Sequence, residues 1–213
     1  MISPGRSDPE LLKKWQSLAR FENEGILSGF RLIAGIDEAG RGPLAGPVVA
    51  ASVIFPIEFA LPGLNDSKQL TCNQREFFYH KILKYAIAVG VGIVESEIVD
   101  QINVLQATLL AAQIAVSSLF PYPDYLLIDA LNLSFIKLPQ KSIIKGDTLS
   151  YSIAGASVIA KVTRDRIMEM YHLQYPEYQF NRHKGYGTRL HLHLLRNHGP
   201  SPIHRKSFKG VNS

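Results

Sequence analysis

The sequence predicts an α/β fold in which a mixed central β-sheet is flanked by helices. Short apolar runs rich in β-branched residues alternate along the chain with longer segments of helical periodicity. Capping residues, glycines and prolines stand between many of these segments. Such alternation is typical of a sheet that carries helices on its faces.

Five segments are expected to form the strands: residues 31–36, 47–55, 86–94, 125–128 and 142–144. The segment 86–94 alternates imperfectly, and its Gly90 and Gly92 indicate close approach of another backbone. Residues 62–70, between the second strand and the next helix, are expected to form a loop.

Capping residues and apolar periodicity predict the helices. The expected helices are residues 8–24, a segment after Thr71, and residues 103–119, 150–175 and 188–197. Thr71 and Gln74 have capping-box spacing, and Gly25 and Gly29 are expected to end the first helix. Phe77 and Leu83 in the second helix, and Leu105 in the third, are expected to face the core.

Length and composition indicate one domain. The 213 residues include 46% hydrophobic and 19% charged residues, which suits a single core. We expect residues 1–213 to form one domain, with an N-terminal helical segment over about 1–30 and a basic C-terminal extension over about 176–213. No internal repeat or low-complexity tract is present.

Several classes of protein are excluded by the residue content. The single cysteine, Cys72, rules out an intrachain disulfide and a zinc site built from cysteines. No run of about 18 apolar residues predicts a membrane span. The N-terminus lacks the apolar core of a signal peptide. We therefore expect a cytoplasmic, monomeric protein.

Positive charge gathers at the C-terminal end of the chain. The net charge is +5, and residues 178–213 hold seven Lys or Arg and no Asp or Glu. The rest of the chain holds 16 basic and 18 acidic residues. A stretch of this kind suits a polyanion such as nucleic acid, and a solvated basic face is the alternative interpretation.

Carboxylates stand where three apolar runs end. Asp37 and Glu38 follow one run, Asp129 ends a second, and Asp147 comes just after a third. Functional sites in open α/β sheets gather outside strand ends, and carboxylate oxygens suit Mg²⁺ or Mn²⁺. Four acids of this kind could hold two cations for displacement at phosphorus. Taken singly, each acid could also be an ordinary turn residue.

A glycine-rich turn follows the first pair of acids. Gly40, Arg41 and Gly42 precede Pro43 and would offer free backbone N–H groups to a sugar hydroxyl or phosphate. A tight turn without a ligand is the alternative. The spacing of a dinucleotide-binding glycine motif is absent.

Six segments carry a resemblance to a known family. They are residues 35–51 (GIDEAGRGPLAGPVVAA), 65–70 (NDSKQL), 145–147 (KGD), 152–165 (SIAGASVIAKVTRD), 183–188 (HKGYGT) and 202–208 (PIHRKSF). In these segments, and in their order, the chain resembles ribonuclease HII, the type 2 ribonuclease H family. The resemblance covers most of the chain.

The resemblance implies a ribonuclease H-like fold with a small C-terminal helical extension. It implies an endonuclease that hydrolyses the RNA strand of RNA–DNA hybrids, and that cuts on the 5′ side of single ribonucleotides in duplex DNA to leave 5′-phosphate ends. Two divalent cations, Mn²⁺ or Mg²⁺, would take part. The implied cellular tasks lie in DNA replication and repair, namely excision of ribonucleotides and removal of RNA primers.

Residue roles follow from the same resemblance. Asp37, Glu38, Asp129 and Asp147 would be the catalytic, metal-binding carboxylates. Gly40, Arg41 and Gly42 would read the 2′-hydroxyl through backbone groups, and Tyr186 would stack on the following sugar. The family usually has Gly-Asn or Gly-Lys after the third aspartate, whereas this chain has Ala130 and Leu131. That departure predicts a loop of different shape after Asp129.

Other polar residues have less definite roles. Lys68, in a loop, is a candidate for phosphate binding. Asp165 is expected to be a structural ion-pair partner, because arginines flank it. Lys161 and Arg164 are assigned either to phosphate contact or to a helix surface. Phosphate contact or surface placement is expected for the five C-terminal histidines, at 183, 191, 193, 198 and 204.

Two alternative functions remain open on the sequence. The chain could be another metal-dependent nuclease of the same fold, of the resolvase or integrase type. It could instead be a non-catalytic nucleic-acid-binding protein that uses its basic C-terminal stretch. Four unneutralised acids would repel a phosphate backbone, which argues against the second alternative.

Overall fold

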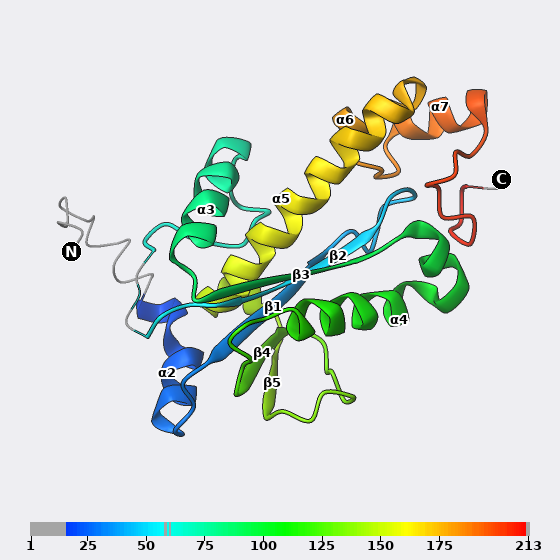
Figure 1. Ribbon diagram of the computed structural model, residues 1–213. Coiled ribbons are helices and arrows are strands. Elements are labelled where there is room, and N and C mark those ends of the chain that lie inside the picture. Colours follow the sequence, from blue (N-terminus) through cyan, green and yellow to red (C-terminus); the bar gives the residue numbers. More distant parts are fainter. Residues whose placement is uncertain (1–15, 58, 60, 212–213) are drawn as a thin grey trace.

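A five-stranded mixed sheet forms the centre of the structure, a computed structural model that describes residues 16–57, 59 and 61–211 (Figure 1). Its strands are β1 (Ile33–Ala39), β2 (Val48–Ile54), β3 (Ala88–Val94), β4 (Tyr125–Asp129) and β5 (Gln140–Ile143). They lie in the order β3-β2-β1-β4-β5. The β1–β2 and β2–β3 pairs are antiparallel, and the β1–β4 and β4–β5 pairs are parallel. The predicted α/β class and mixed sheet are confirmed.

Helices cover both faces of this sheet. They are α2 (Arg20–Leu27), α3 (Cys72–Tyr85), α4 (Ser96–Ser117), α5 (Tyr151–Gln174), α6 (Phe180–His183) and α7 (Arg189–His198), with short 3₁₀ turns η1 (Gly146–Thr148) and η2 (Pro176–Tyr178). Helix α4 packs on β2 and β3, and α5 packs on β1 and β2 from the opposite side. Helices α6 and α7 form a small extension beyond the end of α5 (Figure 1).

The predicted helix caps are present. The Thr71 hydroxyl accepts from the Gln74 N–H, and the Gln74 side chain accepts from the Thr71 N–H, which closes a capping box. Asn103 Oδ1 accepts from the N–H groups of Leu105 and Gln106. Asn103 has non-helical φ/ψ angles (67°, 164°), so it caps the second part of α4 at a kink. The expected helix is therefore the second part of a longer element.

Some expected details of the helices are wrong. Gly25 lies inside α2 instead of ending it, because α2 contacts β1 there and a Cβ atom would lie 2.7 Å from Ile33 Cδ1. The first part of the expected 8–24 helix, residues 8–15, lies outside the described residues. Phe77, Leu83 and Leu105 are half exposed, since α3 and α4 present smaller parts of their surfaces to the core than the periodicity indicated.

Strand β1 is longer than the sequence predicted, and this places the first acids. Pairing with β2 continues through Asp37 opposite Ala51, Glu38 opposite Ala50 and Ala39 opposite Val49. Pairing with β4 stops earlier, at Ile36 opposite Ile128. Asp37 and Glu38 therefore project from a strand that is still held on one edge and is open on the other.

Small residues bring α4 close to the sheet. A Cβ atom added to Gly92 would lie 1.9 Å from the Ala111 carbonyl oxygen, and one added to Gly90 would lie 2.0 Å from that of Ala115. The close approach expected at both glycines is thus confirmed. Among the described residues, α4 alone is long and apolar enough to span a membrane by length and composition. Burial of its alanine-rich face against β2 and β3 is an equally direct reason for that composition.

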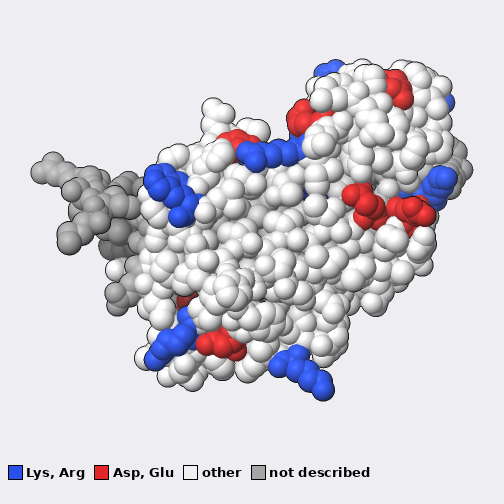
Figure 2. All heavy atoms as spheres, viewed as in Figure 1, with Lys and Arg blue, Asp and Glu red and all other residues white. Residues whose placement is uncertain are grey.

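Charged side chains are sparse on the face seen in Figure 2 and lie mostly near its margins. Half-exposed apolar side chains occur on α4 and in the loop after β4, where Leu105, Ile114 and Phe135 are each 40–44% exposed. The face seen in Figure 2 therefore does not reveal where the carboxylates and the basic C-terminal stretch lie, whereas their contacts do.

The close contact between β3 and α4 predicts an effect on stability. Gly92→Ala should lower the free energy of unfolding by roughly 1–3 kcal/mol, because the methyl group meets helix backbone that can move only with the whole of α4. Urea unfolding followed by circular dichroism measures this change. Gly42→Ala is the matched control, since a Cβ atom there meets no atom within 4 Å. Equal stability of the two variants would contradict the packing argument.

Candidate active site

Three aspartates meet at the carboxyl ends of β1, β4 and β5. One carboxylate oxygen from each of Asp37, Asp129 and Asp147 lies within 4.8 Å of the other two. Asp37 is on β1 and Asp129 is the last residue of β4, and these neighbouring strands run parallel. Asp147 lies in η1, just after β5, and the Gly146 N–H donates to Asp129 Oδ1 at 2.7 Å. The topology therefore brings together acids that are far apart in the sequence.

Glu38 lies beside this group and is not a member of it. Neighbouring residues on a strand project to opposite faces, so the Glu38 side chain does not point in the same direction as that of Asp37. Its Oε1 accepts from Arg41 Nη1 at 3.3 Å, and its side chain is 13% exposed. Glu38 nevertheless lines the same hollow as Asp37 and Asp129.

The hollow has a volume of about 250 Å³ and receives residues from five parts of the chain. Its lining residues are Asp37, Glu38, Ala39, Gly40, Arg41, Gly42, Ser67, Lys68, Asp129, Ser157, Lys161 and Tyr186. The predicted carboxylates of β1 and β4, the glycine turn, Lys68 and Tyr186 thus surround one space. Asp147 borders it through its ion pair with Lys68.

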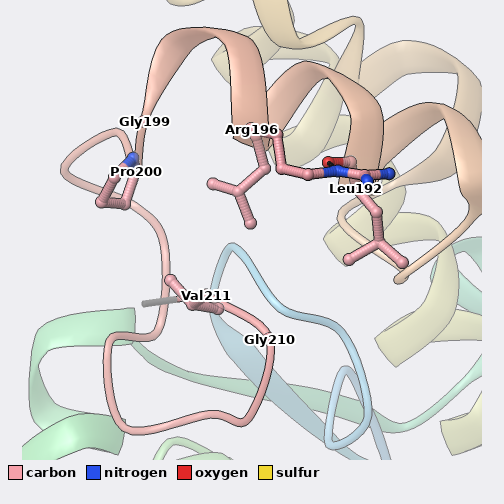
Figure 3. Close-up of a pocket in the computed structure, with 7 residues that line it drawn as sticks. Leu192, Arg196, Gly199, Pro200, Gly210 and Val211 are labelled. Carbon is pink, nitrogen blue, oxygen red and sulfur yellow. Dashed lines mark hydrogen bonds between the residues drawn. The ribbon is translucent and has the colours of Figure 1, made fainter. Parts of the chain in front are cut away.

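A larger cavity of about 690 Å³ lies elsewhere, between α7 and the C-terminal turn (Figure 3). Leu192 and Arg196 of α7 face Gly210 and Val211 across it. No carboxylate is among its lining residues in the described part of the chain. We locate the candidate site in the smaller hollow, because the acids converge there.

The acids in the hollow destabilise one another's charged forms. Burial raises the pKa of Asp37 well above its usual range, and the charges of Glu38 and Asp129 raise it further. Burial also raises the pKa values of Glu38 and Asp129. A cation bound among these carboxylates would remove this penalty, because its charge reverses the local electrostatics.

Lys68 supplies positive charge to the far side of the acidic group. Its Nζ lies 3.3 Å from Asp147 Oδ2 and 3.9 Å from Asp66 Oδ1, and its side chain is 74% exposed. Burial would lower the pKa of Lys68, but the charges of Asp66 and Asp147 raise it overall. Lys68 is therefore held at the site and remains accessible to solvent.

Asp66 is a fifth acid at this site, and sequence reasoning assigned it no role. It is 7% exposed, and its Oδ1 accepts from the Lys68 N–H at 2.9 Å. Burial raises its pKa, with the charge of Asp147 as a further cause. Asp66 lies in a loop instead of at a strand end, so the pattern used to find the other acids could not identify it.

Two buried arginines hold the glycine turn and the residues that follow it. Arg205 donates five hydrogen bonds to the carbonyl oxygens of Gly40, Arg41, Pro43 and Gly46. Arg164 is 1% exposed and donates to the carbonyl oxygens of residues 45, 47 and 184. The expectation that Arg164 contacts phosphate or lies on a helix surface is therefore wrong, because its guanidinium is buried against backbone.

Burial affects the charge of Arg205. It lowers the pKa of the guanidinium to about 9, with the nearby charge of Arg164 as the next cause. That value still leaves Arg205 positively charged at neutral pH. The aligned carbonyl dipoles of the turn therefore solvate a buried cation, as they would a metal ion.

Three of the five C-terminal histidines are buried, contrary to the expectation of surface or phosphate contact. His183 stacks on His191 with ring centroids 4.2 Å apart, and His191 Nε2 lies 3.0 Å from His204 Nε2. His193 and His198 are exposed, as expected. The buried three fill the space between η2, α6, α7 and the C-terminal segment, where stacked aromatic rings replace an aliphatic core.

Hydrogen bonds fix the proton positions in this histidine cluster. The Ser201 N–H donates to His204 Nδ1, so the His204 proton lies on Nε2 and is donated to His191. His191 then carries its proton on Nδ1 and donates it to the Tyr186 carbonyl oxygen. The chain from Ser201 to Tyr186 requires both imidazoles to be neutral.

Asp165 and Lys161 form an ion pair on α5, with Lys161 Nζ 2.7 Å from Asp165 Oδ1. The expected structural role of Asp165 is confirmed, although its partner is Lys161 instead of the flanking arginines. Tyr186 is 44% exposed, and Lys161 Nζ lies 5.9 Å from the centre of its ring. The ring thus faces the hollow with a cation beside it.

The residue after Asp129 adopts a backbone conformation that favours glycine. Ala130 has φ = 49°, and its N–H donates to the Ile143 carbonyl oxygen at 3.0 Å. At the position where the resembling family usually has glycine, the left-handed backbone is thus present with an alanine side chain.

Comparisons of the sequence and of the structure with known proteins give the same result. The profile of the family described as Ribonuclease HII matches residues 34–211. A relative named Ribonuclease HII, from Syntrophus aciditrophicus, is 56% identical over 189 residues, which cover 89% of each chain. The crystal structure of ribonuclease H2 from Pyrococcus horikoshii OT3 matches with a TM-score of 0.71 and 26% identity, over 84% of this chain and 94% of that one.

A more distant structure shares the fold alone. Bst-RNase HIII, solved in complex with Mn²⁺, matches with a TM-score of 0.66 and 17% identity, over 99% of this chain and 74% of that chain. The ribonuclease H-like fold expected from the sequence segments is confirmed by these structural matches.

The strained position at residue 130 gives one testable expectation. Ala130→Gly should raise the free energy of unfolding by about 1 kcal/mol, because glycine adopts positive φ without a Cβ clash. Chemical denaturation measures the change. Ala88→Gly, in strand β3, is the control and should lower stability. A loss of stability in Ala130→Gly would contradict the assigned backbone conformation.

The neutral histidine pair predicts an acid-sensitive fold. Burial lowers the pKa values of His191 and His204 to about 4, whereas the ordinary value is 6.5. Between these values the unfolded chain binds more protons than the folded chain, so stability falls as the pH decreases from 6.5 to 4. The loss should be on the order of 2–3 kcal/mol for each of the two histidines.

A comparison of variants separates the effect of the histidines on the pH dependence of stability from the effect of the acidic residues. Wild-type protein and His191→Gln are unfolded in urea across this pH range, with the exposed His193→Gln as control. The stability difference between wild type and His191→Gln should shrink as the pH decreases, while the difference from His193→Gln stays constant. A constant difference for both variants would show that His191 is not held neutral.

Proposed function

This chain belongs to the ribonuclease HII family, and on that premise we propose that Asp37, Glu38, Asp129 and Asp147 perform its reaction. Members of the family are endonucleases that hydrolyse the RNA strand of RNA–DNA hybrids, and this chain is such an endoribonuclease. The proposal concerns which residues act, with which cations, and at which phosphodiester.

The single observation that carries the proposal is the convergence of Asp37, Asp129 and Asp147. Their oxygens lie close enough together to bind one ion, and burial with mutual repulsion favours a cation among them. All the donors are carboxylate oxygens, which suit Mg²⁺ or Mn²⁺. The Mn²⁺ bound by Bst-RNase HIII supports the same choice of ions.

When bound, two cations would supply an activated water and stabilise the leaving 3′-oxygen. Asp37, Asp129 and Asp147, with Glu38 beside them, would hold these cations. Lys68, accessible beside Asp147, would contact a phosphate of the cleaved strand. The glycine turn lines the same hollow as Asp37 and Asp129, so a phosphate bound by these acids would lie beside that turn.

Recognition of the ribonucleotide is assigned to the glycine turn and Tyr186, which line the same hollow. Gly40, Arg41 and Gly42 would contact the 2′-hydroxyl, which is the group that distinguishes RNA from DNA at one position. Tyr186 would stack on the next sugar. The cut would fall on the 5′ side of the ribonucleotide, with a 3′-hydroxyl and a 5′-phosphate as products, as the family resemblance implies.

The proposed cellular tasks are excision of ribonucleotides from DNA and removal of RNA primers, carried out by a cytoplasmic monomer. A junction resolvase or integrase of the same fold would cut all-DNA substrates, so an all-DNA duplex is the discriminating control. An embedded ribonucleotide that gave no advantage in cleavage would favour that alternative.

Loss of one site carboxylate provides the direct test. Asp37→Asn should lower kcat for a DNA duplex with one ribonucleotide by roughly a thousand-fold or more, as expected when a charged group is removed from a preorganised site. Binding of the duplex should change little. Single-turnover cleavage in Mg²⁺ and in Mn²⁺, mapped to the nucleotide, measures rate and position together.

A second readout reports cation binding without catalysis. Mn²⁺ should raise the melting temperature of the wild-type protein, because it binds the folded state alone, and should do so less in Asp37→Asn. Glu97→Gln, an exposed change on α4, is the control for both assays. Near-normal turnover by Asp37→Asn would overturn the assignment of the site.

A further inference from the structure

We propose that Arg205 is a positioning residue that sets the preference of this enzyme for ribose. It does so by orienting the peptide groups of the glycine turn, without touching the substrate. This inference rests on the proposed reading of a 2′-hydroxyl by Gly40, Arg41 and Gly42. It attributes the orientation of the N–H groups that would contact the 2′-hydroxyl to Arg205, which lies 165 positions from Gly40 in the sequence.

Arg205 contacts the peptide groups whose N–H groups would bind the 2′-hydroxyl. Its Nη2 donates to the Gly40 carbonyl oxygen at 2.6 Å, and its Nη1 donates to the Arg41 carbonyl oxygen at 3.0 Å. Further bonds to Pro43 at 2.9 Å and to Gly46 at 2.8 and 3.0 Å fix the rest of the turn. Arg205 is 0% exposed, so its guanidinium cannot serve as a ligand for nucleic acid.

Because a peptide group is planar, these contacts determine where the N–H groups of Arg41 and Gly42 point. In a trans peptide the C=O and the following N–H point in opposite directions. The Gly40 carbonyl points at Arg205, so the Arg41 N–H points away from it, and the same reasoning applies to the Gly42 N–H. Within the described residues, neither N–H donates to a protein acceptor. Both residues line the hollow, where a ribose hydroxyl would accept these hydrogen bonds.

Only a planar, multiply donating side chain fits this task. A guanidinium presents five N–H groups in a fixed fork, whereas an ammonium presents three around one atom. Lysine at this position would keep the charge and lose the simultaneous contact with the Gly40 and Arg41 carbonyl oxygens. No carboxylate forms an ion pair with Arg205 in the described part of the chain, so the turn is its main polar partner.

The backbone beside Arg205 holds the side chain in register with the turn. The Arg205 N–H donates to the Leu44 carbonyl oxygen, and the Gly46 N–H donates to that of Ile203. Ala45 and His204 form an isolated antiparallel bridge between these bonds. The C-terminal segment thus lies as a short strand against the turn, which leaves the guanidinium little freedom to shift.

Arg164 offers a matched comparison. It is also buried, and its three hydrogen bonds reach the carbonyl oxygens of Ala45, Pro47 and Lys184. These peptides do not supply the N–H groups of Arg41 or Gly42. Arg164 also packs against Gly40 and lies 5.8 Å from the centre of the Tyr186 ring, so the comparison uses the conservative Arg164→Lys, which keeps the aliphatic stem and the charge. That change should loosen the region and leave the bonds from Arg205 to the Gly40 and Arg41 carbonyl oxygens in place.

Ribose preference is the readout that a merely structural role would not move. Two fluorescein-labelled DNA duplexes of one sequence are used, and one of them carries a single central ribonucleotide. Their dissociation constants are measured by anisotropy at one salt concentration in Mg²⁺, with Asp37→Asn as the non-cleaving parent. Their ratio is insensitive to a partly unfolded preparation, because both dissociation constants scale equally with the active fraction.

Adding Arg205→Lys to this parent should reduce the ribose preference about ten-fold, by weakening one or more hydrogen bonds to the 2′-hydroxyl. Affinity for the all-DNA duplex should stay nearly the same. Arg164→Lys should leave the preference intact. If Arg205→Lys does not fold, Arg205→Gln replaces it, because a neutral amide avoids burying an unmatched ammonium, and the same outcomes are expected.

Two failures are distinguishable in this design. A parent protein without ribose preference would overturn the assignment of the glycine turn as the reader of the 2′-hydroxyl. A parent with clear preference that Arg205→Lys retains in full would overturn the role of Arg205 alone. An equal loss of preference in Arg164→Lys would also overturn it, because the effect would then be general loosening of the region.

Discussion

The hydrogen bonds from two buried arginines to the backbone of residues 40–47 are the constraint on which the site depends. A buried cation without partners is strongly destabilising, so Arg164 and Arg205 require the carbonyl oxygens that surround them. These hydrogen bonds hold the backbone of residues 40–47 in one conformation. Through these contacts α5 and the C-terminal segment become parts of the site. The C-terminal extension is therefore a wall of the active centre as well as a basic surface.

The acidic half of the site has the opposite character. Asp37, Asp129 and Asp147 are placed by strand ends, and their charges repel one another in a partly buried space. Lys68 relieves this repulsion on one side only. A backbone turn held by buried hydrogen bonds thus lies beside a group of side chains whose charges are left unbalanced. Such a division suits an enzyme that must hold a sugar in one place and receive cations in another.

Much of this arrangement could be predicted from the sequence, and the rest could not, for physical reasons. Strand ends, the Thr71 capping box and the Asn103 cap leave local patterns, and parallel pairing of β1 with β4 brings the acids together. The basic count of residues 178–213 does not separate the five exposed Lys and Arg from Arg205, which is buried, and Lys184, which pairs with Glu169. Buried histidines and arginines look the same in a sequence as exposed ones. Their partners are backbone carbonyl oxygens, which carry no residue-specific pattern.

The separation in sequence between Gly40 and Arg205 has a consequence for synthesis of the chain on the ribosome. Strands β1 and β2 leave the ribosome before Arg205, whose side chain donates to the turn between them, has been added to the chain. Non-local contacts of this kind form late, since the intervening chain must first be organised. Asp37, Asp129 and Asp147 are therefore all in the nascent chain before the hydrogen bonds from Arg205 to the glycine turn can form. On the proposed role of Arg205, discrimination between ribose and deoxyribose requires synthesis to pass residue 205.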